Sequence, residues 1–88
     1  MKFIDGKYYI MQKIKLIWDF NGVDSLKTAK HFNIHLEEFL EKEEILFHYS
    51  GLDPVNDYHN IVYLVIDKQY LDMIKHALKP QRAFLLED

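Results

Sequence analysis

The chain has 88 residues, which is enough for one domain and too few for two, so we expect a single domain over residues 1–88. It contains no cysteine, which excludes disulfides, thiolate metal sites and cysteine nucleophiles. The net charge of −3 argues against nucleic-acid binding. The apolar runs are too short to span a membrane and the N-terminus lacks a signal-peptide pattern, so we expect a cytoplasmic protein without a membrane partner.

The first half of the chain predicts a strand followed by a helix. Residues 7–19 follow a period of two, with one apolar face and one mixed face, which predicts a long strand. Ile14, Leu16 and Trp18 form the face best suited to a core. Asn21-Gly22 ends this strand. A helix then follows to about residue 43, with a side-chain oxygen of Asp24 or Ser25 capping its first turn.

The second half predicts two strands, a helix and a last strand. Residues 45–50 are expected to form a short strand, and residues 51–58 a loop because they are rich in turn formers. Residues 59–66 are apolar on both faces, which is typical of a central strand. Asp67 is expected to cap a helix that runs to Leu78 and stops before Pro80, and residues 81–86 form the last strand.

This order of elements predicts an α+β fold of the ferredoxin-like βαββαβ type. Its four-stranded antiparallel sheet would carry both helices on one face. Tyr9, Met11 and Ile17 would then point to the bare second face, together with one row of residues 59–66. An exposed apolar face of this size usually marks an interface, so we expect a homodimer that packs through its sheets.

Two histidines four residues apart, His31 and His35, lie on the first predicted helix, with Glu38 one turn later. Three interpretations stay open: a solvated helix edge, a metal site, and a catalytic or ligand-binding His35. On a helical wheel His31 and Glu38 point to solvent, whereas His35 borders the core beside Phe39. We therefore expect no metal and no cofactor, and we keep His35 as a candidate catalytic residue at the rim of a pocket.

His48 lies in the middle of the predicted strand 45–50 and faces the second side of the sheet. It is the other candidate catalytic residue, and the alternative is an interface histidine bonded to a neighbour. Asp53, Asp57 and His59 fall close together and could pair as acid and base, although turn chemistry explains them equally well.

Two further sets of basic side chains are a lysine pair on the first strand and a histidine on the second helix. Lys13 and Lys15 share one strand face, where they could hold an anionic ligand or pair with acidic residues of a partner subunit. His76 is expected on the outer face of the second helix and carries no functional signal.

The stretch 35–54, HLEEFLEKEEILFHYSGLDP, resembles a motif of the YciI-like proteins of the dimeric α+β barrel superfamily. The residues that fit its pattern are His35, Leu36, Phe39, Leu40, Leu46, Gly51 and Pro54. The resemblance implies a sheet-packed dimer, with His35 at the position of a histidine that borders a pocket. The arginine that usually precedes this histidine is absent, since Lys30 and His31 occupy those positions, and the family's aspartate has no clear match.

Two functions follow from these expectations. One is a small-molecule binding or enzymatic domain, with His35 or His48 in a pocket between sheet and helices. The other is a non-enzymatic interaction or regulatory module. The fold alone cannot decide between them, and whether the protein is an enzyme stays open.

Overall fold

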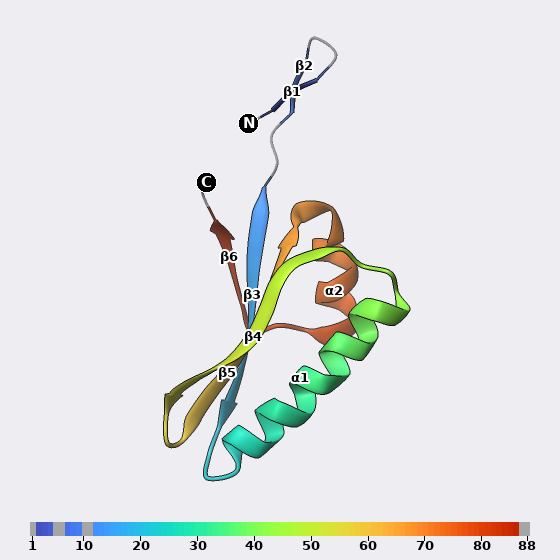
Figure 1. Ribbon diagram of the computed structural model, residues 1–88. Coiled ribbons are helices and arrows are strands. Elements are labelled where there is room, and N and C mark those ends of the chain that lie inside the picture. The colour runs from blue at the N-terminus through green and yellow to red at the C-terminus, as the bar shows by residue number, and fades with distance from the viewer. Residues whose placement is uncertain (1, 5–6, 10–11, 87–88) are drawn as a thin grey trace.

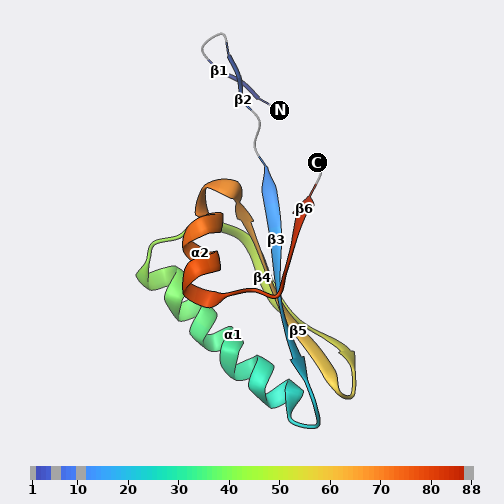
Figure 2. The same cartoon turned by 180° about the vertical axis from the view of Figure 1, so that it is seen from behind.

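The computed structural model describes residues 2–4, 7–9 and 12–86. Its central element is a four-stranded antiparallel sheet. Across the sheet the strands are β4 (Phe47–Asn56), β5 (His59–Asp67), β3 (Lys13–Asn21) and β6 (Arg82–Leu86). The helices are α1 (Ser25–Lys42) and α2 (Leu71–Leu78), and a 3₁₀ turn, η1 (Lys68–Tyr70), precedes α2. Both helices lie on the same side of the sheet (Figures 1 and 2). The predicted α+β class and its four-stranded antiparallel sheet are confirmed.

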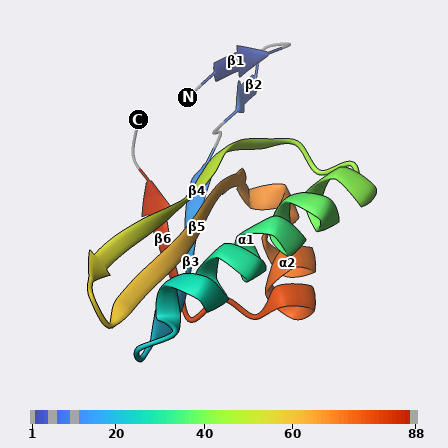
Figure 3. The same cartoon turned by 60° about the horizontal axis from the view of Figure 1, so that its bottom comes forward.

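The hydrophobic core lies between the helices and one face of the sheet. Ile14, Leu16 and Trp18 of β3 are buried there, as predicted, and their cross-strand partners on β5 are also buried. The fully buried side chains include Leu16, Leu36, Leu40, Val62, Leu64, Ile66 and Ile74. The longer helix α1 packs across β3, β4 and β5, and α2 lies beside it (Figure 3). Every strand of this core alternates inward and outward side chains, so its other face points away from the helices.

The predicted strand over residues 7–19 is wrong in its extent. β3 begins only at Lys13, whereas β2 (Lys7–Tyr9) belongs to a separate two-stranded sheet in which it pairs with β1 (Lys2–Ile4). Asp5-Gly6, a residue pair that favours two-residue hairpin turns, separates β1 from β2 in the sequence. The strands β1 and β2 lie beyond the end of β3, away from the main sheet (Figure 1). The predicted positions of the Tyr9 and Met11 side chains lie outside the described residues.

The predicted loop over residues 51–58 is also wrong. β4 continues through this stretch to Asn56, and only Asp57 and Tyr58 separate it from β5. Pro54 is compatible with this strand because β4 is at the edge of the sheet, where a missing N–H breaks no ladder. The register shifts near Phe47 and near Pro54, so the strand carries two irregularities. Tertiary pairing with β5 has overridden the turn-forming composition of this segment.

The limits of α1 agree closely with prediction, whereas α2 begins three residues later than predicted because η1 occupies the first turn after Asp67. The predicted caps are not found. α1 follows Asp24, yet its N-cap makes no side-chain hydrogen bond. Ser25 Oγ instead accepts a hydrogen bond from Asn60 Nδ2 (2.8 Å), and both side chains are buried. Asp67 likewise makes no capping bond to η1. At the other end, α2 stops at Leu78 and Pro80 follows two residues later, as predicted.

The helical spacing of the apolar residues predicts a core-facing stripe on each helix, which includes Leu26 of α1 and Ala77 of α2 and leaves Ile34 on the opposite side. The exposed positions differ in part from these stripes. Ile34 is 58% exposed, as expected from its position opposite the core. Leu26 and Ala77, which were expected to face inward, are exposed. No helix in the described part of the chain is long and apolar enough to cross a membrane.

Candidate functional site: the open face of the sheet

The side of the sheet that faces away from the helices, here called the open face, is not covered by any described element (Figure 2). The register places on it alternate residues of all four strands, aligned in rows that run across the sheet. From β6 to β4, one row is Phe84, Lys15, Val65, Tyr49, and the next is Arg82, Ile17, Tyr63, Gly51. This face therefore carries apolar, aromatic and charged side chains within a few ångströms of one another.

The centre of the open face is apolar. Ile17, Ile61 and Val65 are at most 8% exposed, although no helix covers them. Larger neighbours on the same face shield them: the Tyr63 ring lies beneath Lys15 Nζ at 4.9 Å. The Tyr49 ring meets the Tyr63 ring edge-on, with centroids 6.2 Å apart. The aromatic cover is thus built from the sheet itself, and Tyr49 remains 51% exposed on its outer side.

Gly51 is the position that allows the Tyr63 ring to approach the backbone of β4 closely. A Cβ atom at residue 51 would come within 2.5 Å of Tyr63 Oη and 2.8 Å of Tyr63 Cζ. Such approaches do not occur between real side chains, so the ring would have to move. Gly51, which the sequence suggested only as part of a turn, in fact makes room for an aromatic side chain.

Asp19 holds a polar network on the open face. Its Oδ1 accepts hydrogen bonds from Arg82 Nη2 (2.7 Å) and from the Nε2–H of His59 (2.7 Å), and its Oδ2 accepts one from Arg82 Nε (3.0 Å). The backbone N–H of Asp19 donates to Gln81 Oε1 (3.1 Å). Three strands, β3, β5 and β6, thereby meet at one carboxylate.

The electrostatics of this network favour the ionised carboxylate. Desolvation by itself raises the pKa of Asp19, but the hydrogen bonds and charges of His59 and Arg82 outweigh it. The pKa of Asp19 therefore lies below its ordinary value. Sequence reasoning considered His59 with Asp53 or Asp57, whereas the structure pairs it with Asp19, forty residues away. No local signal indicated this partner, because only the antiparallel register brings β3 beside β5.

His48 lies at the opposite end of the open face, as its predicted orientation required. Its Nε2 is 2.7 Å from Asp67 Oδ1, and both side chains are about one-third exposed or less. Because a carboxylate only accepts, the imidazole N–H donates in this pair. Both ends of β5 therefore take part in a histidine–carboxylate pair: His59 with Asp19 at its start and Asp67 with His48 at its end.

His35 is placed differently from the prediction. It does not border the core: its side chain is 61% exposed on α1. His35 Nε2 lies 3.0 Å from His31 Nε2, and His35 Nδ1 lies 3.1 Å from Glu38 Oε1. The two imidazoles, which the helical wheel separated, are in contact edge to face. The helix radius brings i and i+4 side chains together even when their wheel directions differ by about 40°.

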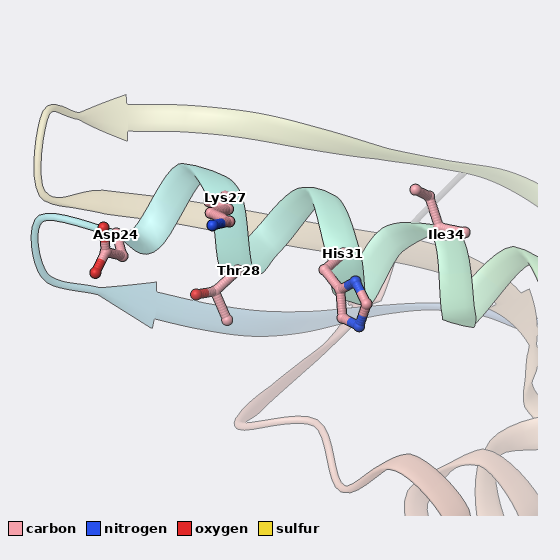
Figure 4. Close-up of a pocket in the computed structure, with 5 residues that line it drawn as sticks. All are labelled: Asp24, Lys27, Thr28, His31 and Ile34. Carbon is pink, nitrogen blue, oxygen red and sulfur yellow. The ribbon is translucent and has the colours of Figure 1, made fainter.

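Neither of two hollows on the described part of the protein is lined by His35 or His48. The larger one, about 570 Å³, is open and is lined by α1 and its N-cap residue (Figure 4). Its lining residues are Asp24, Lys27, Thr28, His31 and Ile34. A smaller one of about 230 Å³ lies between α2 and β6, with the buried Leu16 among its lining residues. Within the described residues, no set of three His, Asp or Glu side chains is arranged to hold a metal ion.

Comparison with known proteins adds no relative. No family model, no curated protein and no solved structure matches this chain. The resemblance of residues 35–54 to the YciI-like proteins therefore stays a prediction.

Proposed function

We propose that this protein is a self-associating interaction module of ferredoxin-like topology, in which two copies pack through the open faces of their sheets. The strand order β4-β5-β3-β6, with both helices on one side, supports this topology. The observation that carries the proposal is the composition of the open face, where an apolar centre is bordered by exposed aromatic residues and by charges at both ends. Apolar surface of this kind, rimmed by polar groups, is typical of protein interfaces.

The size of the face is compatible with a dimer. β3 has nine residues and is therefore about 30 Å long, and four strands give a width of about 19 Å. Because β6 has only five residues, the flat area is roughly 500 Å². Side-chain relief increases the accessible area toward the ~800 Å² per partner of a standard interface. The exposed rings of Tyr49 and Phe84 lie within this area and would be covered by association.

Analytical ultracentrifugation of the full chain over a micromolar concentration series tests the proposal. We expect a monomer–dimer equilibrium that Phe84→Glu shifts to monomer. A glutamate at this position would lose its hydration in the interface, and the neighbouring Lys15 would offset that cost only in part. Ile34→Glu is the matched control: this residue is 58% exposed, compared with 47% for Phe84, but lies on α1, away from the open face. A wild-type monomer at every concentration, or equal effects of the two variants, would overturn the proposal.

A second candidate function is small-molecule binding with acid–base chemistry, and the His48–Asp67 pair favours it. An imidazole held 2.7 Å from a carboxylate has a fixed orientation, which is what a general acid or base requires. Nuclear magnetic resonance with a library of small organic acids, amines and phenols tests this function. We expect a compound that binds to shift the ring signals of His48 in the wild-type protein. In His48→Gln the same compound should no longer shift the signals of the surrounding residues. A library that leaves these signals unchanged argues against it.

A further inference from the structure

The two halves of the open face differ in charge. β3 and β6 present three cations, Lys13, Lys15 and Arg82, and one carboxylate, Asp19, which gives this half a net charge of +2. β5 and β4 present two carboxylates, Asp67 and Asp53, and no lysine or arginine on the same face, which gives −2 with neutral histidines. The boundary between the halves runs along the strands, between β3 and β5.

The exposed aromatic residues follow the same division. Phe84 is on the edge strand β6 and Tyr49 is on the edge strand β4, and they are 47% and 51% exposed. Both belong to one row, because Phe84 pairs with Lys15, Lys15 with Val65, and Val65 with Tyr49. If a second copy is turned so that its halves are exchanged and its rows stay aligned, Phe84 of one copy therefore lies over Tyr49 of the other.

We propose that the second copy packs on the open face about a two-fold axis that runs parallel to the strands, between β3 and β5. This inference rests on the proposed self-association and defines its geometry. The β3/β6 half of each copy then covers the β5/β4 half of the other. Opposite charges face each other on both sides of the axis, and Phe84 of one copy meets Tyr49 of the second copy twice. Aligned packing of two sheets is a common arrangement of this kind.

The alternative two-fold axis, perpendicular to the strands, is less favourable. It would place β6 on β6 and β4 on β4 of the second copy, because it keeps each strand over itself. Each half of the open face would then cover a half of the same sign, and like charges that face each other across an interface disfavour association. The division of charge along the strands thus selects one axis.

Cysteine crosslinking tests the axis, because the natural chain contains no cysteine. Two packed sheets lie about 10 Å apart, which exceeds the Cα separation of about 7 Å that a direct disulfide bridges, so the reagent is a short bismaleimide. We expect Tyr49→Cys/Phe84→Cys to form a covalent dimer with this reagent, because residue 49 of each copy faces residue 84 of the other. Each single variant should stay monomeric on a denaturing gel, because its two cysteines would lie on opposite edges of the interface, three strand spacings or about 14 Å apart across the strands.

A second measurement does not depend on replacing the two rings. Asp53→Lys adds a cation to the acidic half, close to where Arg82 of the second copy would lie, and we expect it to raise the dissociation constant of the dimer at least tenfold. Asp57→Lys is the control, since this residue is in the β4–β5 turn. Both constants are measured by analytical ultracentrifugation, and circular dichroism verifies the folding of each variant.

The outcomes separate this inference from the proposed function. A wild-type chain that stays monomeric refutes both. A wild-type dimer in which the double-cysteine variant does not crosslink, or in which Phe84→Cys crosslinks alone, refutes the axis and leaves the self-association intact. Equal dissociation constants for Asp53→Lys and Asp57→Lys refute the charge argument.

Discussion

Replacing Asp19 with asparagine is the change with the clearest predicted effect on stability. The carboxylate accepts three side-chain hydrogen bonds, at 2.7, 2.7 and 3.0 Å, from His59 and Arg82. An asparagine retains one acceptor oxygen, but its amide group would place a second donor beside the donors of Arg82 or His59. The variant should therefore lose most of the network that joins β3, β5 and β6.

The magnitude follows from the burial of the partners. A hydrogen bond to a charged group contributes about 1.5–3 kcal/mol when it is well shielded. The Asp19 side chain is 18% exposed but that of Arg82 is 44% exposed, so solvent screens the ion pair. We expect a loss of about 2 kcal/mol for the whole network, which corresponds to a decrease of roughly 10 °C in Tm for a domain of this size.

The same substitution should change how stability depends on pH. The pKa of Asp19 is lower in the folded state than its ordinary value, so the network stabilises the protein fully above the unfolded-state pKa. This contribution is lost as pH falls below about 4 and through the folded-state pKa. Asparagine does not titrate, so the difference between wild type and Asp19→Asn should shrink over this acidic range.

Urea denaturation followed by circular dichroism, at pH 7 and at steps down to strong acid, provides the measurement. Asp57→Asn is the control, because it removes a carboxylate from the exposed β4–β5 turn. The reasoning fails if Asp19→Asn is as stable as wild type at neutral pH, or if their free energies of unfolding stay parallel throughout the acid range.

Three further predictions concern the packing of the sheet, and thermal denaturation measures each of them. Gly51→Ala should destabilise the protein by about 1–2 kcal/mol by displacing the Tyr63 ring, and the additional change Tyr63→Leu should remove most of that penalty; equal penalties with and without Tyr63 would contradict the contact. Trp18→Phe should cost about 1–2 kcal/mol because Trp18 Nε1 donates a 2.7 Å hydrogen bond to the Leu78 carbonyl oxygen; an unchanged Tm would show that this bond contributes little. Leu64→Ala, at a fully buried position, should cost about 2–5 kcal/mol, and a smaller loss would mean that the core collapses into the space.

The sequence was sufficient to predict those elements that depend on residues close together in the chain. The apolar stripe of α1, the inward face of β3 and the end of α2 before Pro80 could be predicted because each follows from residues a few positions apart. The errors occurred where pairing competes with local preference. The period-two pattern of residues 7–19 does not show that β2 pairs with β1. The turn formers after Gly51 do not show that pairing with β5 keeps this segment in a strand as far as Asn56.

The open face was predicted as a bare surface, but only the tertiary structure decided its chemistry. His48 was correctly placed on this face, whereas its partner Asp67 was expected to cap a helix. Asp19 and Arg82 are 63 residues apart, and no spacing rule links them. The sequence fixes which side chains alternate along each strand, while the antiparallel register alone decides which of them become neighbours, because that register depends on the whole sheet.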